Sequence, residues 1–226
     1  MFRTLKITPI ILLFVAPLAW GQNNVFDHIE QAEKSIITVQ TELTRVIKTT
    51  PPKKITYYRT AIGIVLESSG LIVTNTHTII HAPFIFVILR DGTKLPAKLI
   101  FTSRSYDFSF LRIHPPYPLK KIRWANSSQT HIGEAILVVK NSDYAHRSIL
   151  EGHIKNILKT KRNGSNDFLE LDLDLHHGDS GGPILDNRGR LLGIVMAKSK
   201  SQPNTSLAIA SNKIHQQYLH YKENVP

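Results

Sequence analysis

The chain has 226 residues, of which 42% are hydrophobic and 20% charged, and its formal net charge at pH 7 is +11. A chain of this length and composition can bury a substantial core, as one large domain or two small ones, so we expect a globular protein. Its basic balance favours anionic partners such as nucleic acid, anionic lipid or cell-envelope polymers. The basic residues are scattered, however, and no nucleic-acid-binding motif is present, so we expect no specific nucleic-acid partner.

The chain contains no cysteine. A secreted form would therefore depend on its core rather than on disulfides, and a lipid anchor on an N-terminal cysteine is excluded. The same absence excludes the chemistry of cysteine proteases.

The first 21 residues have the features of a secretory signal peptide. Arg3 and Lys6 give a basic start, residues 7–20 are uncharged and largely apolar, and small residues precede a cleavage site after Gly21. A membrane anchor is the alternative, but prolines within the run and the polar residues 22–24 leave too few apolar residues to span a bilayer. We therefore expect a secreted or periplasmic protein with no transmembrane segment after signal removal. Loss of the two basic residues lowers the net charge to +9.

Most of the remaining chain consists of short aliphatic and β-branched runs separated by turn residues. The runs occupy residues 35–40, 61–66, 71–74, 84–89, 94–101, 108–113, 135–140, 149–158, 168–175, 183–186, 190–197 and 206–210. About a dozen short strands without alternating long helices predict an all-β barrel or sandwich. Short helices are expected at the two ends, over residues 22–34 and 212–222.

Three prolines, Pro115, Pro116 and Pro118, interrupt the strand pattern near the middle of the chain. Proline cannot donate a hydrogen bond to a sheet ladder. The prolines therefore mark a connection between two β units, at about residues 35–114 and 120–210.

The stretch "HHGDSGGPILD", residues 176–186, places one serine in a frame of glycines closed by a proline. At average residue frequencies the hexapeptide "GDSGGP" would occur by chance with a probability on the order of 10⁻⁵ in a chain this long. A nucleophilic serine needs a base, a group that orients the base, and donors for the oxyanion. The backbone N–H groups of Gly178 and Ser180 are suited to be those donors.

His77 and Asp107 are the candidate base and orienting group. His77 follows an apolar strand that stops at Thr74, and strand ends are where rigid scaffolds present catalytic groups. Asp107 precedes a strand with apolar neighbours, beginning with Phe108, that would dehydrate it. A buried carboxylate needs a partner, and an imidazole N–H is a suitable one.

These residues lie in stretches that resemble the trypsin-like peptidases of the HtrA/Deg type. The stretches are "VTNTH" (73–77), "DFSFLRI" (107–113) and "GDSGGP" (178–183), and the likeness extends over residues 30–222. The resemblance implies a trypsin-like protease domain over residues 35–226, with two six-stranded Greek-key β-barrels. It also implies a serine endopeptidase in which His77, Asp107 and Ser180 form the catalytic triad, with no cofactor and no metal.

The chain departs from the family pattern in two ways that matter. Family members usually carry PDZ domains after the protease domain, and this sequence stops at Pro226. Asp179 stands where HtrA-type members more often have Asn. In digestive trypsin-like enzymes an Asp at this position pairs with a newly cut N-terminus. No counterpart of that N-terminus is evident here, so the partner of Asp179 is left open between a basic side chain and the backbone.

By resemblance, the substrate pocket for the residue before the cut involves Asp174, Leu175, Val195 and Met196. Mostly aliphatic walls favour a medium-sized apolar side chain. Asp174 would instead favour a basic one if it points inward, and strand alternation leaves the two alternatives open.

A zinc enzyme is an alternative, because two histidines in "HTIIH" (77–81) have the spacing of a helical zinc pair and the pair His176-His177 lies close to Ser180. The metalloprotease motif requires a Glu directly after its first His, and Thr78 stands there instead. We therefore expect no catalytic metal.

The competing function is a catalytically silent or latent peptide-binding or chaperone protein with a protease fold. A latent form would require the loops around residues 142–148 and 161–167 to rearrange. Protein or peptide substrates are expected in either case. The resemblance also suggests a homotrimer assembled through the N-terminal segment, in which Phe26 is the only aromatic residue before residue 57 once the signal peptide is removed.

Overall fold

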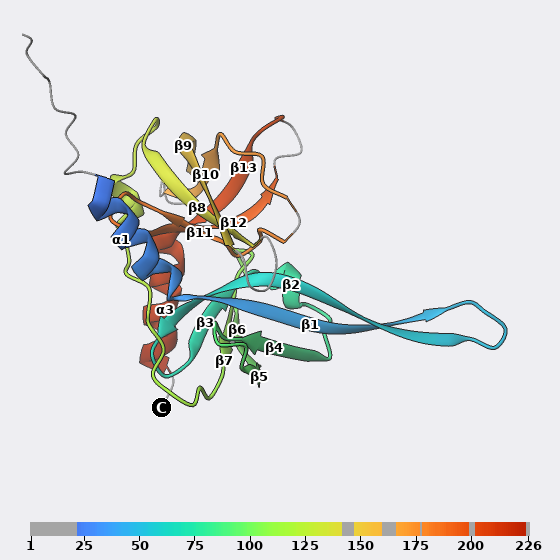
Figure 1. Cartoon of the computed structure of the whole chain (residues 1–226). Helices are drawn as coiled ribbons and strands as arrows, with labels where there is room; N and C mark the ends of the chain where they lie inside the picture. The colour runs from blue at the N-terminus through green and yellow to red at the C-terminus, as the bar shows by residue number, and fades with distance from the viewer. Residues whose placement is uncertain (1–21, 142–146, 160–165, 177, 199–201, 225–226) are drawn as a thin grey trace, which may run out of the picture.

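The computed structural model describes residues 22–141, 147–159, 166–176, 178–198 and 202–224. The predicted signal peptide lies outside this part of the chain, and so do most of the two loops considered for a latent form. The all-β prediction with short terminal helices is confirmed: two β units lie side by side, α1 (Gln22–Glu33) starts the described chain and α3 (Ser211–Asn224) ends it (Figure 1). Within the described residues, every helix is too short or too polar to cross a bilayer.

Seven strands and a one-turn helix form the first unit. The strands are β1 (Ile36–Ile47), β2 (Lys53–Glu67), β3 (Leu71–Thr74), β4 (Phe84–Ile88), β5 (Lys94–Pro96), β6 (Lys98–Thr102) and β7 (Ser109–Arg112), and the helix is α2 (Thr76–Ile79). They form an antiparallel sheet in the order β5-β4-β1-β2-β3-β7-β6. The two edge strands are separated in sequence by Ala97 alone, so the sheet has to curl until its edges approach each other.

The second unit is a closed barrel in the order β10-β13-β12-β11-β8-β9. Its strands are β8 (Ala135–Asn141), β9 (Arg147–Lys159), β10 (Asn166–Leu171), β11 (Pro183–Leu185), β12 (Leu191–Lys198) and β13 (Ser206–Ala210). A segment containing the three prolines and the 3₁₀ turn η1 (Ser127–Gln129) connects the two units.

The strand count of the first unit differs from six because residues 94–101, expected as one strand, are two. Pro96 has no N–H, and the Ala97 N–H still donates to Ile85 O of β4 at 2.9 Å, so the chain leaves β4 only after Ala97. β5 therefore pairs with β4, whereas β6 pairs with β7 on the opposite edge.

The run expected at residues 168–175 also ends early, since β10 stops at Leu171. Beyond it the Leu175 N–H donates to the side-chain hydroxyl of Ser206 in β13 at 3.1 Å, and not to a backbone carbonyl. The side chains of Leu169, Leu171 and Leu175 nevertheless all lie in the barrel core.

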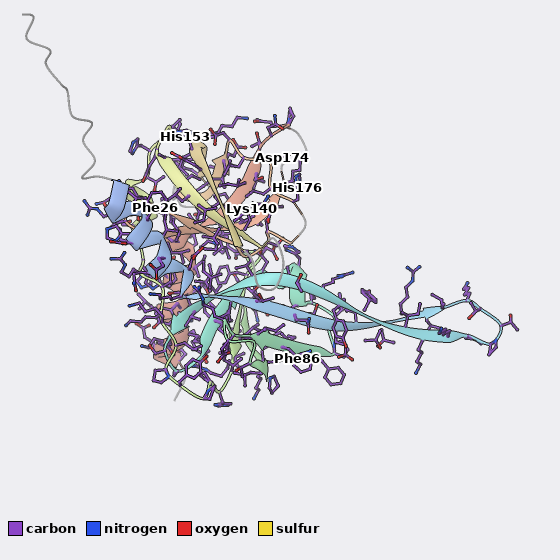
Figure 2. All side chains as sticks on the ribbon, viewed as in Figure 1. Phe26, Phe86, Lys140, His153, Asp174 and His176 are labelled. Atoms are coloured by element: carbon purple, nitrogen blue, oxygen red, sulfur yellow. The ribbon has the colours of Figure 1, made fainter. Side chains whose placement is uncertain are left out.

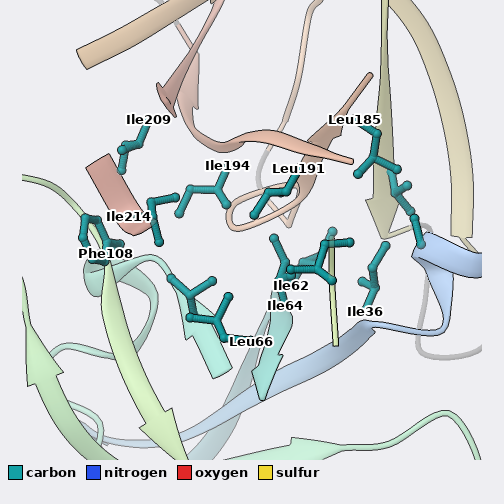
Figure 3. Close-up of a cluster of buried hydrophobic side chains, with 14 of the residues drawn as sticks. Ile36, Ile62, Ile64, Leu66, Phe108, Leu185, Leu191, Ile194, Ile209 and Ile214 are labelled. Carbon is teal, nitrogen blue, oxygen red and sulfur yellow. The ribbon is translucent and has the colours of Figure 1, made fainter. Parts of the chain in front are cut away.

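The largest buried cluster joins the two units. Ile62 and Phe108 from the first sheet contact Leu185 and Ile209 from the barrel, and Ile214 of α3 is buried with them (Figure 3). Burial of apolar surface at this junction fixes the position of one sheet against the other, because each square ångström removed from water contributes about 25 cal/mol.

The hairpin of β1 and β2 is much longer than expected. The apolar runs predict strands at residues 35–40 and 61–66, but pairing continues from Ile36↔Ile64 to Ile47↔Lys53. Figure 1 shows the hairpin projecting far beyond the two β units.

Candidate active site

His77 lies in α2, directly after β3 of the first sheet. Asn75, which is buried between them, donates its side-chain amide to Asp107 O at 2.8 Å. The backbone N–H of His77 donates to Asp107 Oδ1 at 2.9 Å. These two bonds tie the histidine turn to the aspartate loop through both backbone and side chain.

Asp107 precedes β7, whose pairing with β3 brings it to the same end of the sheet as His77. The register of that pair aligns Thr74 with Ser109. Phe108 is fully buried and anchors the chain beside the carboxylate. The Asp107 side chain is still 26% exposed, so its apolar neighbours dehydrate the carboxylate less than the sequence predicted.

The three predicted triad residues form one hydrogen-bonded chain. His77 Nδ1 lies 2.5 Å from Asp107 Oδ2, and His77 Nε2 lies 3.1 Å from Ser180 Oγ. Asp107 can therefore hold the imidazole in the tautomer that leaves Nε2 free to accept the serine proton. The His77 side chain is 48% exposed, so a ligand can reach it from solvent.

Backbone hydrogen bonds hold the Ser180 loop between the two β units. The Ile62 N–H donates to Ser180 O at 3.0 Å, and the Gly181 N–H donates to Val195 O at 3.0 Å. Gly181 has φ +81°, and a Cβ atom there would lie 2.2 Å from Ile62 O. Only glycine permits both this conformation and this approach, so the glycine frame shapes the loop that carries the serine.

The backbone N–H groups of Gly178 and Ser180 are available as donors. Gly178 has φ +102°, which glycine tolerates and other residues rarely adopt. Within the described part of the chain, neither N–H donates to a protein acceptor. Both could bind a developing oxyanion beside Ser180 Oγ.

Asp179 has both kinds of partner that the sequence left open. The residue is only 3% exposed, and its Oδ2 accepts the His176 N–H at 2.8 Å. Lys140 Nζ of β8 lies 3.6 Å from the same oxygen. The Lys140 ammonium group therefore balances the charge of the carboxylate next to the nucleophile, and the His176 N–H donates a hydrogen bond to it.

The cavity beside the triad has a volume of about 570 Å³. It is lined by Arg59, Thr60, His77, Thr78, Gly178 and Ser180. The sequence reasoning did not identify Arg59 and Thr60 of β2 as cavity residues. The sequence gives little indication of their role, because they lie just before the apolar run 61–66 that predicted this strand, and β2 in fact begins at Lys53.

The four residues assigned to the substrate pocket do not share one environment. Leu175 and Val195 are each 2% exposed and pack in the core of the second barrel. Met196 is partly buried against the junction between the two units. None of the four lines the cavity formed by the described residues beside Ser180.

Asp174 is paired with Lys198 at the end of β12, with Oδ1 2.5 Å from the ammonium nitrogen. This hydrogen bond has the largest effect and lowers the pKa of Asp174. Burial opposes it, and the positive charges of Lys198, His176 and Lys140 each lower the pKa by a smaller amount. Figure 2 shows Asp174 close to His176 on the second barrel, with Lys140 nearby. The carboxylate that could attract a basic substrate residue is thus already matched by a cation.

Metal binding has no support in the described part of the chain, where no group of three or more His, Asp or Glu residues is arranged to hold an ion. His77 is committed to Asp107 through Nδ1, and His81, its proposed zinc partner, lies beyond the C-cap of α2 with φ 64°. The neighbour of His176 in the "HH" pair lies outside the described residues.

Comparisons with known proteins agree with this geometry. The chain is 31% identical over 134 residues to the serine endoprotease DegS of Salmonella typhimurium, covering 58% of this chain and 38% of that protein. It is 30% identical over 156 residues to the periplasmic pH-dependent serine endoprotease DegQ of Escherichia coli, covering 66% of this chain and 34% of that one. The chain therefore spans between a third and two fifths of the length of these relatives.

The fold matches the solved structure of an HtrA-type protease, AlgW with a decapeptide, at a TM-score of 0.76 and 20% identity. The match covers 88% of this chain and 67% of that one. A family model, the trypsin-like peptidase domain, matches residues 61–194, a range that includes His77, Asp107 and Ser180. The chain therefore belongs to the trypsin-like peptidase domain family, with relatives among the Deg/HtrA serine endoproteases.

Proposed function

We propose that the protein is a serine endopeptidase that cleaves peptide bonds through Ser180, His77 and Asp107. The observation that carries this proposal is the continuous chain from Asp107 Oδ2 through the His77 ring to Ser180 Oγ, with distances of 2.5 and 3.1 Å. Two uncommitted backbone donors beside Ser180 support it. A protein that only binds peptides would need neither arrangement.

The reaction begins when Ser180 Oγ attacks the peptide carbonyl carbon and its proton moves to His77 Nε2. The carbonyl oxygen becomes an oxyanion that accepts hydrogen bonds from the Gly178 and Ser180 N–H groups. Asp107 stabilises the imidazolium and fixes its orientation. His77 then protonates the leaving nitrogen, the C–N bond breaks, and an ester to Ser180 remains. His77 then deprotonates a water molecule, which attacks this ester. As the carboxylic acid product leaves, His77 gives the proton to Ser180 Oγ.

The proposed substrates are unfolded or extended protein segments. At its end β12 extends beyond β11: among the described residues, Ala197 and Lys198 have strand partners only on β13, and Met196 is the extra residue at a register shift in that pairing. The other edge of this segment is therefore available to pair with the substrate residues before the cleaved bond, as an added strand. Folded domains would not present such a strand.

The test is labelling with a fluorophosphonate, which reacts only with an activated serine. We expect one adduct by intact mass on the wild type, none on Ser180→Ala, and unchanged labelling on the matched control Ser69→Ala, an exposed serine in the turn between β2 and β3. Casein cleavage should fall on the order of 10⁶-fold in Ser180→Ala. A folded wild-type protein that never labels, with or without added peptide, would instead identify a silent or latent peptide-binding protein.

We also propose that residues 1–21 are removed after Gly21 during export to the periplasm or the exterior. The relatives named periplasmic in Escherichia coli support this localisation. N-terminal sequencing of the exported protein should give Gln22 as the first residue. An uncleaved N-terminus in the membrane fraction would contradict the proposal.

A homotrimer built through α1 is a further proposal. Phe26 is 69% exposed on α1, next to an apolar groove of about 420 Å³ between this helix and strands β8 and β9 (Figure 2). Light scattering should give the mass of three chains for the wild type and of one chain for Phe26→Ser. A monomeric wild type would remove the proposal.

A further inference from the structure

Beyond their pairing with each other, the two strands of the far part of the β1–β2 hairpin, residues 43–59, pair with no other strand of the described chain. β4 pairs with β1 only over Thr38–Glu42, and β3 pairs with β2 only from Ile64 onward. Figure 1 shows this part, called the arm below, standing clear of both β units. An isolated two-stranded hairpin is at best marginally stable in water, so an arm of this length presents surfaces suited to a partner.

The arm is basic and partly apolar. It carries Arg45, Lys48, Lys53, Lys54 and Arg59, and residues 43–66 contain no Asp or Glu. None of these five cations forms an ion pair with another described residue. Apolar and aromatic side chains lie between them, with Val46, Ile55, Tyr57 and Tyr58 between 38% and 55% exposed.

The arm continues directly from the active-site cavity. Arg59, at its base, lines the cavity together with His77 and Ser180. The Arg59 guanidinium lies 5.8 Å from the centre of the Tyr57 ring, so the two side chains share one side of β2. By the pairing register, Arg45 lies opposite Ile55 on that same side. A cationic and aromatic strip therefore leads outward from the catalytic groups.

This strip lies on the side of the cavity that receives the part of the substrate after the cleaved bond. His77 has to protonate the leaving nitrogen, so that nitrogen and the residues that follow it pass on the His77 side. The residues before the bond are proposed to pair with β12, in the other β unit. Of the residues that line the cavity, Arg59, Thr60 and Thr78 belong to β2 and α2, in the same β unit as His77.

We propose that the arm binds the substrate segment that follows the cleaved bond and selects segments in which Asp or Glu alternate with apolar residues. This proposal rests on the endopeptidase function proposed above and specifies its substrate class. Charge complementarity provides the selection, because a cationic strip without acidic residues attracts an acidic chain and repels a basic one. The exposed Ile55 and Tyr57 provide apolar contacts along the same strip.

The test compares three substrates with identical residues before the cut, taken from the preferred sites in casein. The first continues after the cut with about ten residues rich in Asp and Glu. The second replaces each acidic residue by Asn or Gln. The third ends in a small fluorescent amine, so it cannot reach the arm. Each is assayed for kcat/KM at low and at high salt.

Two variants with the same loss of charge are compared with the wild type. The arm variant is R45Q/K48Q/K53Q/K54Q, which leaves Arg59 at the cavity in place. The control variant is K98Q/R104Q/K120Q/K121Q, which removes four exposed cations outside the cavity and the arm. Circular dichroism melting checks that both variants fold.

The wild type should cleave the acidic peptide about tenfold more efficiently than the neutral one, because several weak exposed charge pairs act together. The arm variant should lose this preference and keep its rate on the short amine substrate, whereas the control variant should keep both. High salt should reduce the wild-type preference, since the charges involved are exposed.

If the wild type cleaves the short amine substrate and cleaves the acidic and the neutral peptide at equal rates, the arm proposal is overturned and the endopeptidase function is left intact. Failure to cleave any of the three substrates would remove both proposals. Arm-dependent binding to vesicles of anionic phospholipid, together with equal rates on the two peptides, would assign the arm to a membrane surface instead.

Discussion

The ammonium group of Lys140 lies 3.6 Å from the carboxylate of Asp179, the residue directly before Ser180. Asp179 is almost fully buried, and a buried carboxylate without a cation would be strongly destabilised. Lys140 thus gives Asp179 a positive charge, as a newly cut N-terminus does for the corresponding Asp in digestive trypsin-like enzymes. Because the lysine is part of β8, no cleavage event is needed to supply the positive charge.

We predict that Lys140→Met lowers kcat on peptide substrates by about 10- to 100-fold with little change in KM. An unpaired Asp179 carboxylate would move toward water and displace the Gly178 N–H, and loss of one oxyanion donor costs about 100-fold or more. The check is steady-state kinetics together with the rate of fluorophosphonate labelling.

The matched control for this prediction is the double variant Lys140→Met/Asp179→Asn. An Asn side chain can still accept the His176 N–H without carrying a charge, so the double variant should recover most of the activity. A purely structural role of Lys140 in packing would leave the double variant as impaired as the single one. That result would contradict the role proposed for the ion pair.

The pairing of Asp174 with Lys198 leads to a prediction about specificity. With its charge matched, Asp174 should not attract a basic substrate residue, so the wild type should cleave after Val, Leu or Ile. Lys198→Ala frees the carboxylate and should raise cleavage after Arg and Lys by about tenfold relative to cleavage after Leu. Sequencing of the products from a peptide library measures this ratio.

Two results would show whether Asp174 contacts the substrate residue before the cleaved bond or acts only on the protein surface. The double variant Asp174→Asn/Lys198→Ala should lose the gain in basic cleavage, because it has no free carboxylate. If Lys198→Ala alone leaves the profile unchanged, Asp174 does not face the substrate residue before the cut.

The sequence pattern singled out His77, Asp107 and the Ser180 turn from short local segments. His77 and Asp107 each stand next to a strand end, and their side chains approach each other once β3 pairs with β7. The turn around Ser180 is encoded by glycines, whose conformational demands are visible without a structure. Ser180 reaches His77 only because the two β units pack together, with the Ile62 N–H donating to Ser180 O.

The features that the sequence did not reveal depend on contacts between distant segments. The Lys140–Asp179 pair forms only because β8 and the Ser180 loop meet in the second barrel, and no pattern around Lys140 distinguishes it from other lysines. The arm was missed because both of its faces mix polar and apolar residues, so neither strand shows the alternation typical of a half-buried sheet.

A buried ion pair between Lys213 and Asp167 fixes α3 to β10. The ammonium nitrogen lies 2.8 Å from Asp167 Oδ1, with the two side chains 8% and 1% exposed. We predict that Lys213→Met lowers the free energy of unfolding by about 3–5 kcal/mol, because it removes one partner of a buried ion pair and leaves the other in place. Urea unfolding measures this change.

The double variant Lys213→Met/Asp167→Asn provides the control for this ion pair. It removes both charges, so it should be more stable than Lys213→Met alone. A loss below about 1 kcal/mol in the single variant would show that solvent already compensates the pair.

Tyr106 should make stability fall at alkaline pH. Its hydroxyl donates to Asp167 Oδ2 at 3.0 Å. Burial, this hydrogen bond and the negative charge of Asp167 raise the pKa of Tyr106 from 10.0 to about 12. Between these two values the unfolded chain has lost the phenol proton and the folded chain has kept it. The contribution of Tyr106 to stability is therefore fully present below pH 10 and is lost as the pH rises toward 12.

The variant Tyr106→Phe isolates this effect from the other groups that titrate at high pH. Below pH 10 the wild type should be more stable by about 1–3 kcal/mol, because Phe leaves a buried acceptor with one donor fewer. Denaturant unfolding of both proteins from pH 8 to 11.5 should show this difference shrinking above pH 10. A difference that stays constant across the range would mean that the Tyr106 proton is not held by Asp167.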